Sequence, residues 1–91
     1  MRLDNYISDL GIIKRRTVAK EKAAGGHIKV NDNRAKPAYR VKVGDIIEIT
    51  GTQHIIIKVL QIPDGKSVPK AVREEYYELL TRESGRDALD I

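Results

Sequence analysis

Several residue types with strong structural or chemical roles are missing from this chain. It contains no cysteine, which excludes disulfide bonds and thiol catalysis. Phenylalanine and tryptophan are also absent, so four tyrosines are the only aromatic side chains besides histidine. The longest apolar run, Ile55-Ile56-Ile57, is far shorter than the roughly 20 residues that a membrane-spanning helix needs. The sequence therefore predicts neither a disulfide-stabilised protein nor a membrane-spanning one.

The length and composition are typical of one small globular domain. The 91 residues are 41% hydrophobic and 33% charged, which is typical neither of a disordered chain nor of a membrane-spanning one. Met1 is followed by the largely polar stretch Arg2-Leu3-Asp4-Asn5, so we expect no signal peptide. A cytoplasmic location is the resulting expectation.

Positive charge is concentrated in one segment. Residues 14–42 contain ten lysines and arginines against Glu21 and Asp32, a net charge of +8, whereas the whole chain carries +4. The basic residues of this segment are Lys14, Arg15, Arg16, Lys20, Lys22, Lys29, Arg34, Lys36, Arg40 and Lys42. Such a block favours binding to a polyanion, either nucleic acid or an anionic membrane surface. A membrane-binding helix would need large apolar residues opposite its lysines, and no segment fits that pattern well.

Two helices are predicted near the N-terminus. Apolar residues recur with helical spacing at Leu3, Tyr6, Ile7 and Leu10, which predicts a helix over residues 3–10 that ends at Gly11. A second helix is predicted from about residue 15 to residue 24, and Gly25-Gly26 would end it. Its expected core contacts are Val18, Ala19 and Ala23.

Alternating apolar residues predict strands in the middle of the chain. Residues 27–30 form a short strand that is followed by a tight turn at Asn31-Asp32-Asn33, because Asn and Asp tolerate positive φ. The β-branched runs at residues 46–50 and 54–60 are joined across Gly51-Thr52 and are interpreted as a hairpin.

A third helix is predicted in the C-terminal part, with Ser67 as its cap and Pro69 in its first turn. We expect it to end at Ser84-Gly85 and residues 86–91 to form a loose tail. The apolar side of this helix would consist of Val68, Val72, Tyr76, Leu79 and Leu80. The predicted fold class is α+β: two N-terminal helices packed on a small, mostly antiparallel sheet, with a C-terminal helix. Residues 1–62 would form the main domain, and residues 63–91 the C-terminal helix and tail.

Short motifs follow one another along the first half of the chain, within residues 2–49. They are Arg2-Leu3-Asp4, Lys14-Arg15-Arg16-Thr17 with Ala19, Gly26-x-Ile28-x-Val30-Asn31, Lys36-Pro37 and Val41-x-Val43-Gly44-Asp45-x-Ile47. In their order and spacing these motifs resemble a known family, the ribosomal protein S4-type RNA-binding domain, or alpha-L RNA-binding motif. Two residues depart from the pattern, because Asp32 stands where the family usually has Gly and Lys22 where many members have an apolar residue.

The nearest resemblance is to short, free-standing members of that family that associate with the ribosome, in bacterial ribosome-associated quality control and in the heat-shock response. It implies binding to a large ribosomal subunit obstructed by peptidyl-tRNA, with contacts to large-subunit rRNA and to the tRNA. It also implies that the protein supports tailing of the stalled nascent chain by an RqcH-type factor. We expect a monomer that does not bind membranes.

The candidate RNA-binding residues fall into two groups. Arg2, Arg15, Arg16 and Lys20 are the expected direct contacts, since arginine's planar guanidinium suits phosphate oxygens and base edges. The alternatives are a solvated helix face and, for Arg2, an ion pair with Asp4 or Asp9. A more diffuse attraction to RNA is expected from Lys29, Arg34, Lys36, Arg40 and Lys42. Lys14 and His27 are further candidates, and for His27 a surface histidine without an RNA contact is the open alternative.

Neither catalysis nor metal binding is expected. No nucleophile is paired with a base, no Gly-rich phosphate loop occurs, and the two histidines lie 27 residues apart without a cysteine. We therefore predict no enzyme activity, no metal and no cofactor.

Two rival functions stay open: a free-standing module for tRNA or mRNA, and a protein-interaction adaptor that uses Glu74, Glu75 and Glu78.

Overall fold

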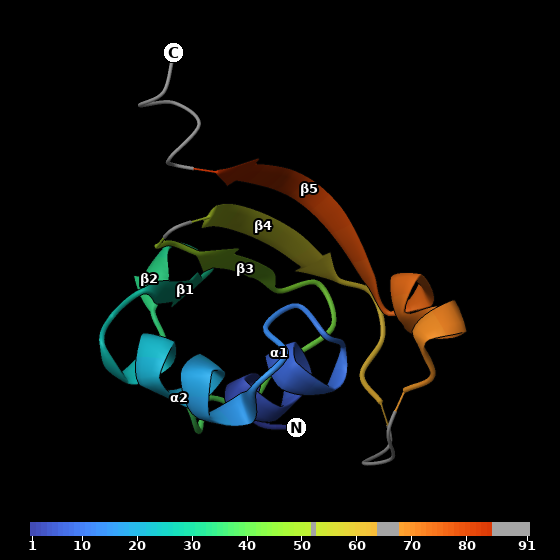
Figure 1. The fold of residues 1–91 in the computed structure, drawn as a ribbon, viewed down its shortest axis with the longest axis horizontal. Coiled ribbons are helices and arrows are strands. Elements are labelled where there is room, and N and C mark those ends of the chain that lie inside the picture. The colour runs from blue at the N-terminus through green and yellow to red at the C-terminus, as the bar shows by residue number, and fades with distance from the viewer. Residues whose placement is uncertain (52, 64–67, 85–91) are drawn as a thin grey trace.

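A five-stranded antiparallel sheet with two helices on one of its faces forms the body of the protein (Figure 1). The fold is described from a computed structural model, in which residues 1–51, 53–63 and 68–84 are placed. The strand order is β2-β1-β3-β4-β5. The elements are α1 (Leu3–Asp9), α2 (Arg16–Ala24), β1 (Ile28–Val30), β2 (Asn33–Arg34), β3 (Ile46–Ile49), β4 (Gln53–Val59), the 3₁₀ helix η1 (Lys70–Glu75) and β5 (Tyr77–Ser84). The predicted α+β class and antiparallel sheet are confirmed.

The two N-terminal helices lie where the apolar spacing predicts them. The four apolar residues of the first helix are buried, and the chain turns away at Gly11, whose φ is +72°. In α2 the buried residues are Ala19 and Ala23, as predicted, whereas the third expected core contact, Val18, is only half-buried and is not among the residues packed on the core. Small side chains let a helix approach its neighbours closely. Because α2 packs through these two alanines, its remaining, mostly charged residues lie at the surface.

The hairpin between β1 and β2 turns at two residues with positive φ. Asn31 has a φ of 52° and Asp32 a φ of 70°, as a two-residue turn matched to the twist of a hairpin requires. Asp32 therefore adopts the left-handed conformation at the position where Gly would carry no steric cost. The predicted tight turn is confirmed, and its last residue, Asn33, begins the two-residue strand β2.

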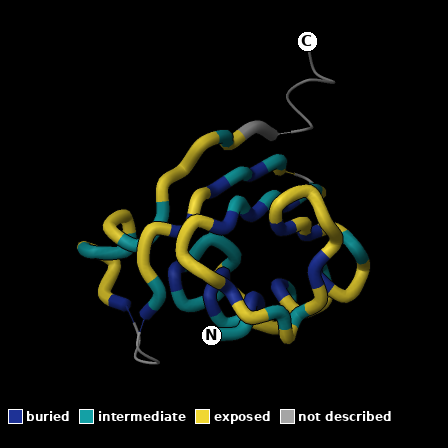
Figure 2. The backbone as a smooth tube through the Cα atoms, turned by 180° about the vertical axis from the view of Figure 1, so that it is seen from behind, coloured by how far each residue is buried: buried dark blue, intermediate teal, exposed yellow. Residues whose placement is uncertain are grey.

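The core lies between the sheet and the helices. Alternate residues of β3 and β4 face the helices, namely Ile47 and Ile49 on one strand and Ile55, Ile57 and Val59 on the other. Figure 2 shows the buried residues on the inner sides of the helices and the sheet. The predicted hairpin of these two strands is confirmed, with Ile47 opposite Ile57 and Ile49 opposite Ile55.

The predicted C-terminal helix is correct only in its first part. Residues 70–75 form a 3₁₀ helix, whereas residues 77–84 form β5, which pairs with β4 from Val59↔Tyr77 to Gln53↔Ser84. Val68, Val72 and Tyr76 do contact the core as expected. Ser67 and residues 86–91, the predicted cap and tail, lie outside the described residues.

The physical reason for this difference is backbone pairing with β4. As a strand, residues 77–84 supply hydrogen-bond partners along the outer edge of β4, which a helix could not do. Leu79 and Leu80, expected on the apolar side of a helix, are instead 47% and 46% exposed on β5. Their spacing matches a helical face, but tertiary pairing outweighs that local pattern.

Among the described residues, no helix has the length and apolar character needed to cross a membrane.

Tyr6 connects α1 to the start of β5 and makes stability sensitive to alkaline pH. Its hydroxyl donates to the carbonyl of Tyr76 at 3.0 Å. Burial, followed by the proximity of Tyr77, raises the pKa of Tyr6 above its ordinary value of 10.0. The folded protein therefore keeps Tyr6 protonated at a pH where the unfolded chain loses that proton, so stability falls as pH rises through 10.0.

We predict that Tyr6→Phe lowers the free energy of unfolding by about 1 kcal/mol at neutral pH. The cost is small because the Tyr76 carbonyl still accepts the backbone N–H groups of Leu60 and Gln61. The variant should also lose less stability than the wild type when the pH is raised above 10.0. Urea denaturation of both proteins at neutral and alkaline pH measures this, and equal alkaline losses would contradict the role of Tyr6.

Candidate nucleic-acid interface

The first half of α2 and the two residues before it present basic side chains to solvent. Lys14, Arg15, Arg16 and Lys20 are exposed, whereas Ala19 on the opposite side is fully buried. Arg15 is the N-cap residue of the helix, and its side chain makes no capping hydrogen bond. Within the described parts of the chain, the only salt bridges are Arg2–Asp4 and His54–Glu48, so these four cations have no acidic partner there. The helix thus presents positive charge that an anion can neutralise.

Arg2 is fixed by a buried carboxylate. Its Nε and Nη2 atoms donate to the two oxygens of Asp4 at 3.1 and 3.2 Å, and the backbone N–H of Asn5 donates to the same carboxylate at 2.8 Å. The Asp4 side chain is completely buried, whereas that of Arg2 is 39% exposed. Arg2 therefore has a structural role and still presents part of its guanidinium to solvent.

The N-terminal residues also pair with the loop that carries Arg40. Arg2 and Arg40 form an isolated antiparallel bridge, flanked by backbone hydrogen bonds between Leu3 and Tyr39 and between Val41 and Met1. The two arginines line a surface hollow of about 430 Å³. The fold thus brings together two predicted site residues that are 38 positions apart in the sequence.

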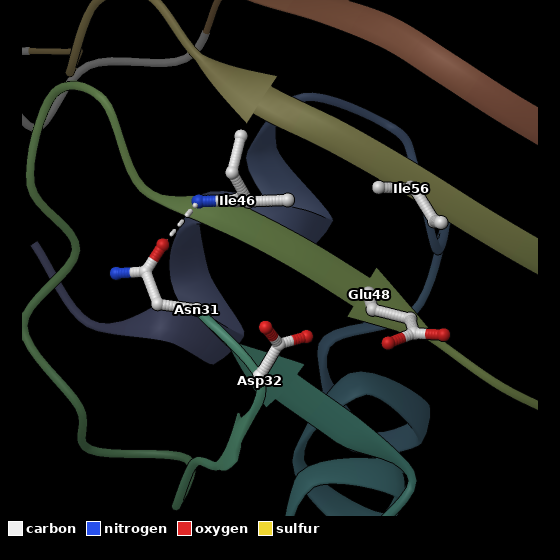
Figure 3. A pocket seen from close by; sticks show the side chains of 5 residues that line it. All are labelled: Asn31, Asp32, Ile46, Glu48 and Ile56. Carbon is white, nitrogen blue, oxygen red and sulfur yellow. Dashed lines mark hydrogen bonds between the residues drawn. The ribbon is translucent and has the colours of Figure 1, made fainter.

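Asp45 holds the long loop that follows β2. Its buried carboxylate accepts hydrogen bonds from Asn31 Nδ2 at 3.1 Å, from the Tyr39 hydroxyl at 2.9 Å and from the Lys42 backbone N–H at 2.9 Å. Partial burial and the Asp45 carboxylate raise the pKa of Tyr39. Asn31 in turn accepts the N–H of Ile46 at 3.0 Å, as Figure 3 shows. These contacts leave the predicted site residues Lys36, Arg40 and Lys42 exposed on a loop of defined shape.

A second group of basic residues lies beside the C-terminal end of α2. Lys29 on β1 is directly opposite Arg34 on β2, and like charges in that arrangement repel. Arg34 and Lys36 line a hollow of about 270 Å³ together with Gly25 and Gly26. Other residues lining it are Ala23, Ala24 and Ala35. Exposed His27 follows directly after this glycine pair.

Two features at the surface do not suit RNA. The hollow in Figure 3 is lined by Asp32 and Glu48 with Asn31, Ile46 and Ile56, so its charge would repel phosphate. Lys22, a member of the predicted basic segment, is half-buried and donates to the carbonyl of Thr50 at 3.5 Å. This hydrogen bond joins α2 to the end of β3.

In the portion of the chain that is described, no cluster of three or more His, Cys, Asp or Glu side chains could hold a metal ion.

Sequence reasoning did not identify two basic residues that lie close to the predicted set. Lys70 and Arg73 on η1 share a hollow of about 400 Å³ with Lys14. Both belong to the segment predicted as a C-terminal helix, where they lie beside Glu74 and Glu75 and have no motif around them. Only the placement of η1 against the connection between α1 and α2 reveals their position.

Known proteins support the resemblance found in the sequence. Residues 1–47 match the model of the S4 domain family. The chain is 45% identical over 82 residues to the "RQC P-site tRNA stabilizing factor" of Streptococcus pneumoniae, with 89% of this chain and 91% of that protein aligned. It is 34% identical over 84 residues to the protein of the same name from Helicobacter pylori, with 91% and 100% aligned.

A solved structure shares the fold. The trimeric structure of Vibrio cholerae heat shock protein 15 superposes with a TM-score of 0.76 at 25% identity and covers 99% of this chain and 87% of that one. The likeness therefore extends beyond the S4 domain into the C-terminal part of the chain.

We predict that Arg2→Ala lowers the free energy of unfolding by about 1–3 kcal/mol, because it leaves the buried Asp4 carboxylate with fewer donors. Arg2→Ala combined with Asp4→Ala should be more stable than Arg2→Ala alone, since no unpaired buried charge remains. Thermal or urea unfolding of both variants and the wild type tests this. A single variant as stable as the wild type would show that Asp4 does not depend on Arg2.

Proposed function

The chain belongs to the S4-domain family and, within it, to the RQC P-site tRNA stabilizing factors, and we propose from this that it binds large ribosomal subunits that carry a P-site tRNA. There it contacts both large-subunit rRNA and the tRNA during quality control of stalled ribosomes. By holding the tRNA in place, it supports tailing of the nascent chain by an RqcH-type factor. It acts in the cytoplasm as a monomeric binding factor and not as a catalyst.

The observation that supports this proposal best is the exposed basic surface at the start of α2. Arg15, Arg16 and Lys20 have no acidic neighbour within salt-bridge distance among the placed residues, and the buried alanines behind them orient their side chains outward. Lys14 and Arg2 extend the positive charge towards the N-terminus, and Lys29, Arg34, Lys36, Arg40 and Lys42 extend it across the hairpin and loop, next to the polar candidate His27. A phosphate backbone matches such a surface.

The aromatic residues favour recognition of a folded RNA by its shape and backbone. Proteins that read single strands present exposed aromatic side chains on which bases stack. Here Tyr6 is fully buried, and Tyr39, Tyr76 and Tyr77 are half-buried against the core. Both rRNA helices and tRNA offer the structured backbone that arginine and lysine can contact.

We predict that Arg15→Ala combined with Arg16→Ala weakens binding to tRNA-carrying large subunits at least about tenfold, since a charge-assisted hydrogen bond contributes ~1.5 kcal/mol or more. The salt dependence of binding should fall by roughly one to two counterions. Stability should stay within about 0.5 kcal/mol of the wild type, because both side chains are exposed and Arg15 makes no capping hydrogen bond.

The matched control is Lys58→Ala combined with Arg82→Ala, which removes the same charge from exposed positions on β4 and β5. Cosedimentation with purified large subunits at several salt concentrations compares the two pairs. The site assignment is wrong if the α2 variant cosediments as fully as the control.

We also predict that the protein binds large subunits with a P-site tRNA more tightly than empty subunits or free tRNA. The reason is that contacts to rRNA and tRNA add only when both are present in one complex. Filter binding or cosedimentation with the three ligands measures this preference. Equal affinity for free tRNA would favour a module that acts on tRNA away from the ribosome. Binding that is insensitive to salt would favour a protein-interaction adaptor.

A further inference from the structure

One basic hollow lies only partly within the segment that matches the S4 domain. Two parts of the chain meet there: the connection between α1 and α2, and the 3₁₀ helix η1. The hollow has a volume of about 400 Å³ and is lined by Ser8, Gly11, Lys14, Lys70 and Arg73. Lys70 and Arg73 lie more than 20 residues beyond the matched residues 1–47.

Arg73 is held in place before any ligand binds. Its Nε atom donates to the carbonyl of Val68 at 3.1 Å, and its guanidinium rests on Gly11. A Cβ atom at Gly11 would overlap Nη1 of Arg73, and the φ of +72° at Gly11 also favours glycine at this position. Because the side chain is already ordered, it loses little conformational entropy on binding an anion.

The charges around the hollow leave an anion as the complementary ligand. The lining residues include three cations and no carboxylate. Among the residues that the structure places, none of these three cations forms a salt bridge. Ser8 uses its hydroxyl hydrogen towards the carbonyl of Asn5, so the donors available to a ligand are those of the three basic side chains. Three cations around one hollow repel each other, and a bound anion would relieve that repulsion.

We propose that this hollow binds a backbone phosphate of the same RNA that α2 contacts, an inference that rests on the proposed function. Lys14 directly precedes Arg15 and Arg16, so the hollow continues the basic surface of α2. An RNA strand that follows α2 reaches Lys14 and then Lys70 and Arg73 on η1. The C-terminal part of the chain thereby adds a phosphate contact that the S4 domain alone does not contain.

The absence of cysteine allows a direct test by tethered cleavage. An iron chelate attached to a single introduced cysteine generates hydroxyl radicals that cut RNA close to the attachment site. Ala71→Cys places the probe at an exposed position on η1 and keeps all three cations. Thr17→Cys places it at an exposed position on α2, and Lys58→Cys on the face of the sheet away from the helices.

On tRNA-carrying large subunits, the probe at position 71 should cut RNA at sites adjacent to those cut from position 17. Cleavage from position 71 no greater than from position 58, while position 17 still cuts, would overturn the hollow and leave the proposed function standing. Failure of positions 17 and 71 together would overturn both. Cleavage from position 71 alone would support the hollow and contradict the assignment of α2.

A binding measurement provides the second arm. Lys14→Ala combined with Lys70→Ala should weaken binding about tenfold and reduce the salt dependence by roughly one to two counterions. Arg73 is left unchanged because it also binds the Val68 carbonyl. The control is again Lys58→Ala with Arg82→Ala, and equal affinities of the two pairs would overturn the proposal.

Discussion

Packing of two short helices on the sheet is the constraint on which the basic surface depends. Helices of seven and nine residues are too short to be stable by themselves in water, so tertiary contacts must hold them. Burial of Ala19 and Ala23 holds α2, and burial of the apolar face of α1 holds its neighbour. Without this packing, Arg16 and Lys20 would belong to a disordered segment and would not share one surface.

Two buried carboxylates order the rest of that surface. Asp4 fixes Arg2, and Asp45 collects donors from Asn31, Tyr39 and Lys42. A buried carboxylate is costly unless it is hydrogen-bonded, so each one defines the conformation of the backbone and side chains around it. These two acidic groups are thereby used inside the fold, and Lys36, Arg40 and Lys42 on the loop form no salt bridge among the described residues.

The surface is therefore electrostatically unfavourable in the free protein. Lys29 opposes Arg34 across the hairpin, and Lys14 shares a hollow with Lys70 and Arg73. Repulsion of this kind lowers the stability of the free fold and strengthens the binding of a polyanion that neutralises it. This trade-off is typical of proteins that bind a phosphate backbone in competition with salt.

Much of this protein could be predicted because its signals are local. Helical spacing at Leu3, Tyr6 and Ile7, alternation in β3 and β4, and the tolerance of Asn31 and Asp32 for positive φ each act within a few residues. The concentration of charge in residues 14–42 and the S4-type motifs are likewise visible in the sequence alone. These patterns determine the α+β class and point to RNA.

Only the tertiary structure decided the remaining features, because each depends on groups distant in the sequence. Residues 77–84 have spacing compatible with a helix, and the open edge of β4 makes them a strand. The pairing of Arg2 with Asp4 was one of several open alternatives until burial of Asp4 required a cation. Arg73 meets Gly11 across 62 positions of sequence, a contact that no local pattern encodes. Local periodicity determined the buried sides of α1, β3 and β4, whereas backbone pairing within the sheet decided that residues 77–84 form a strand.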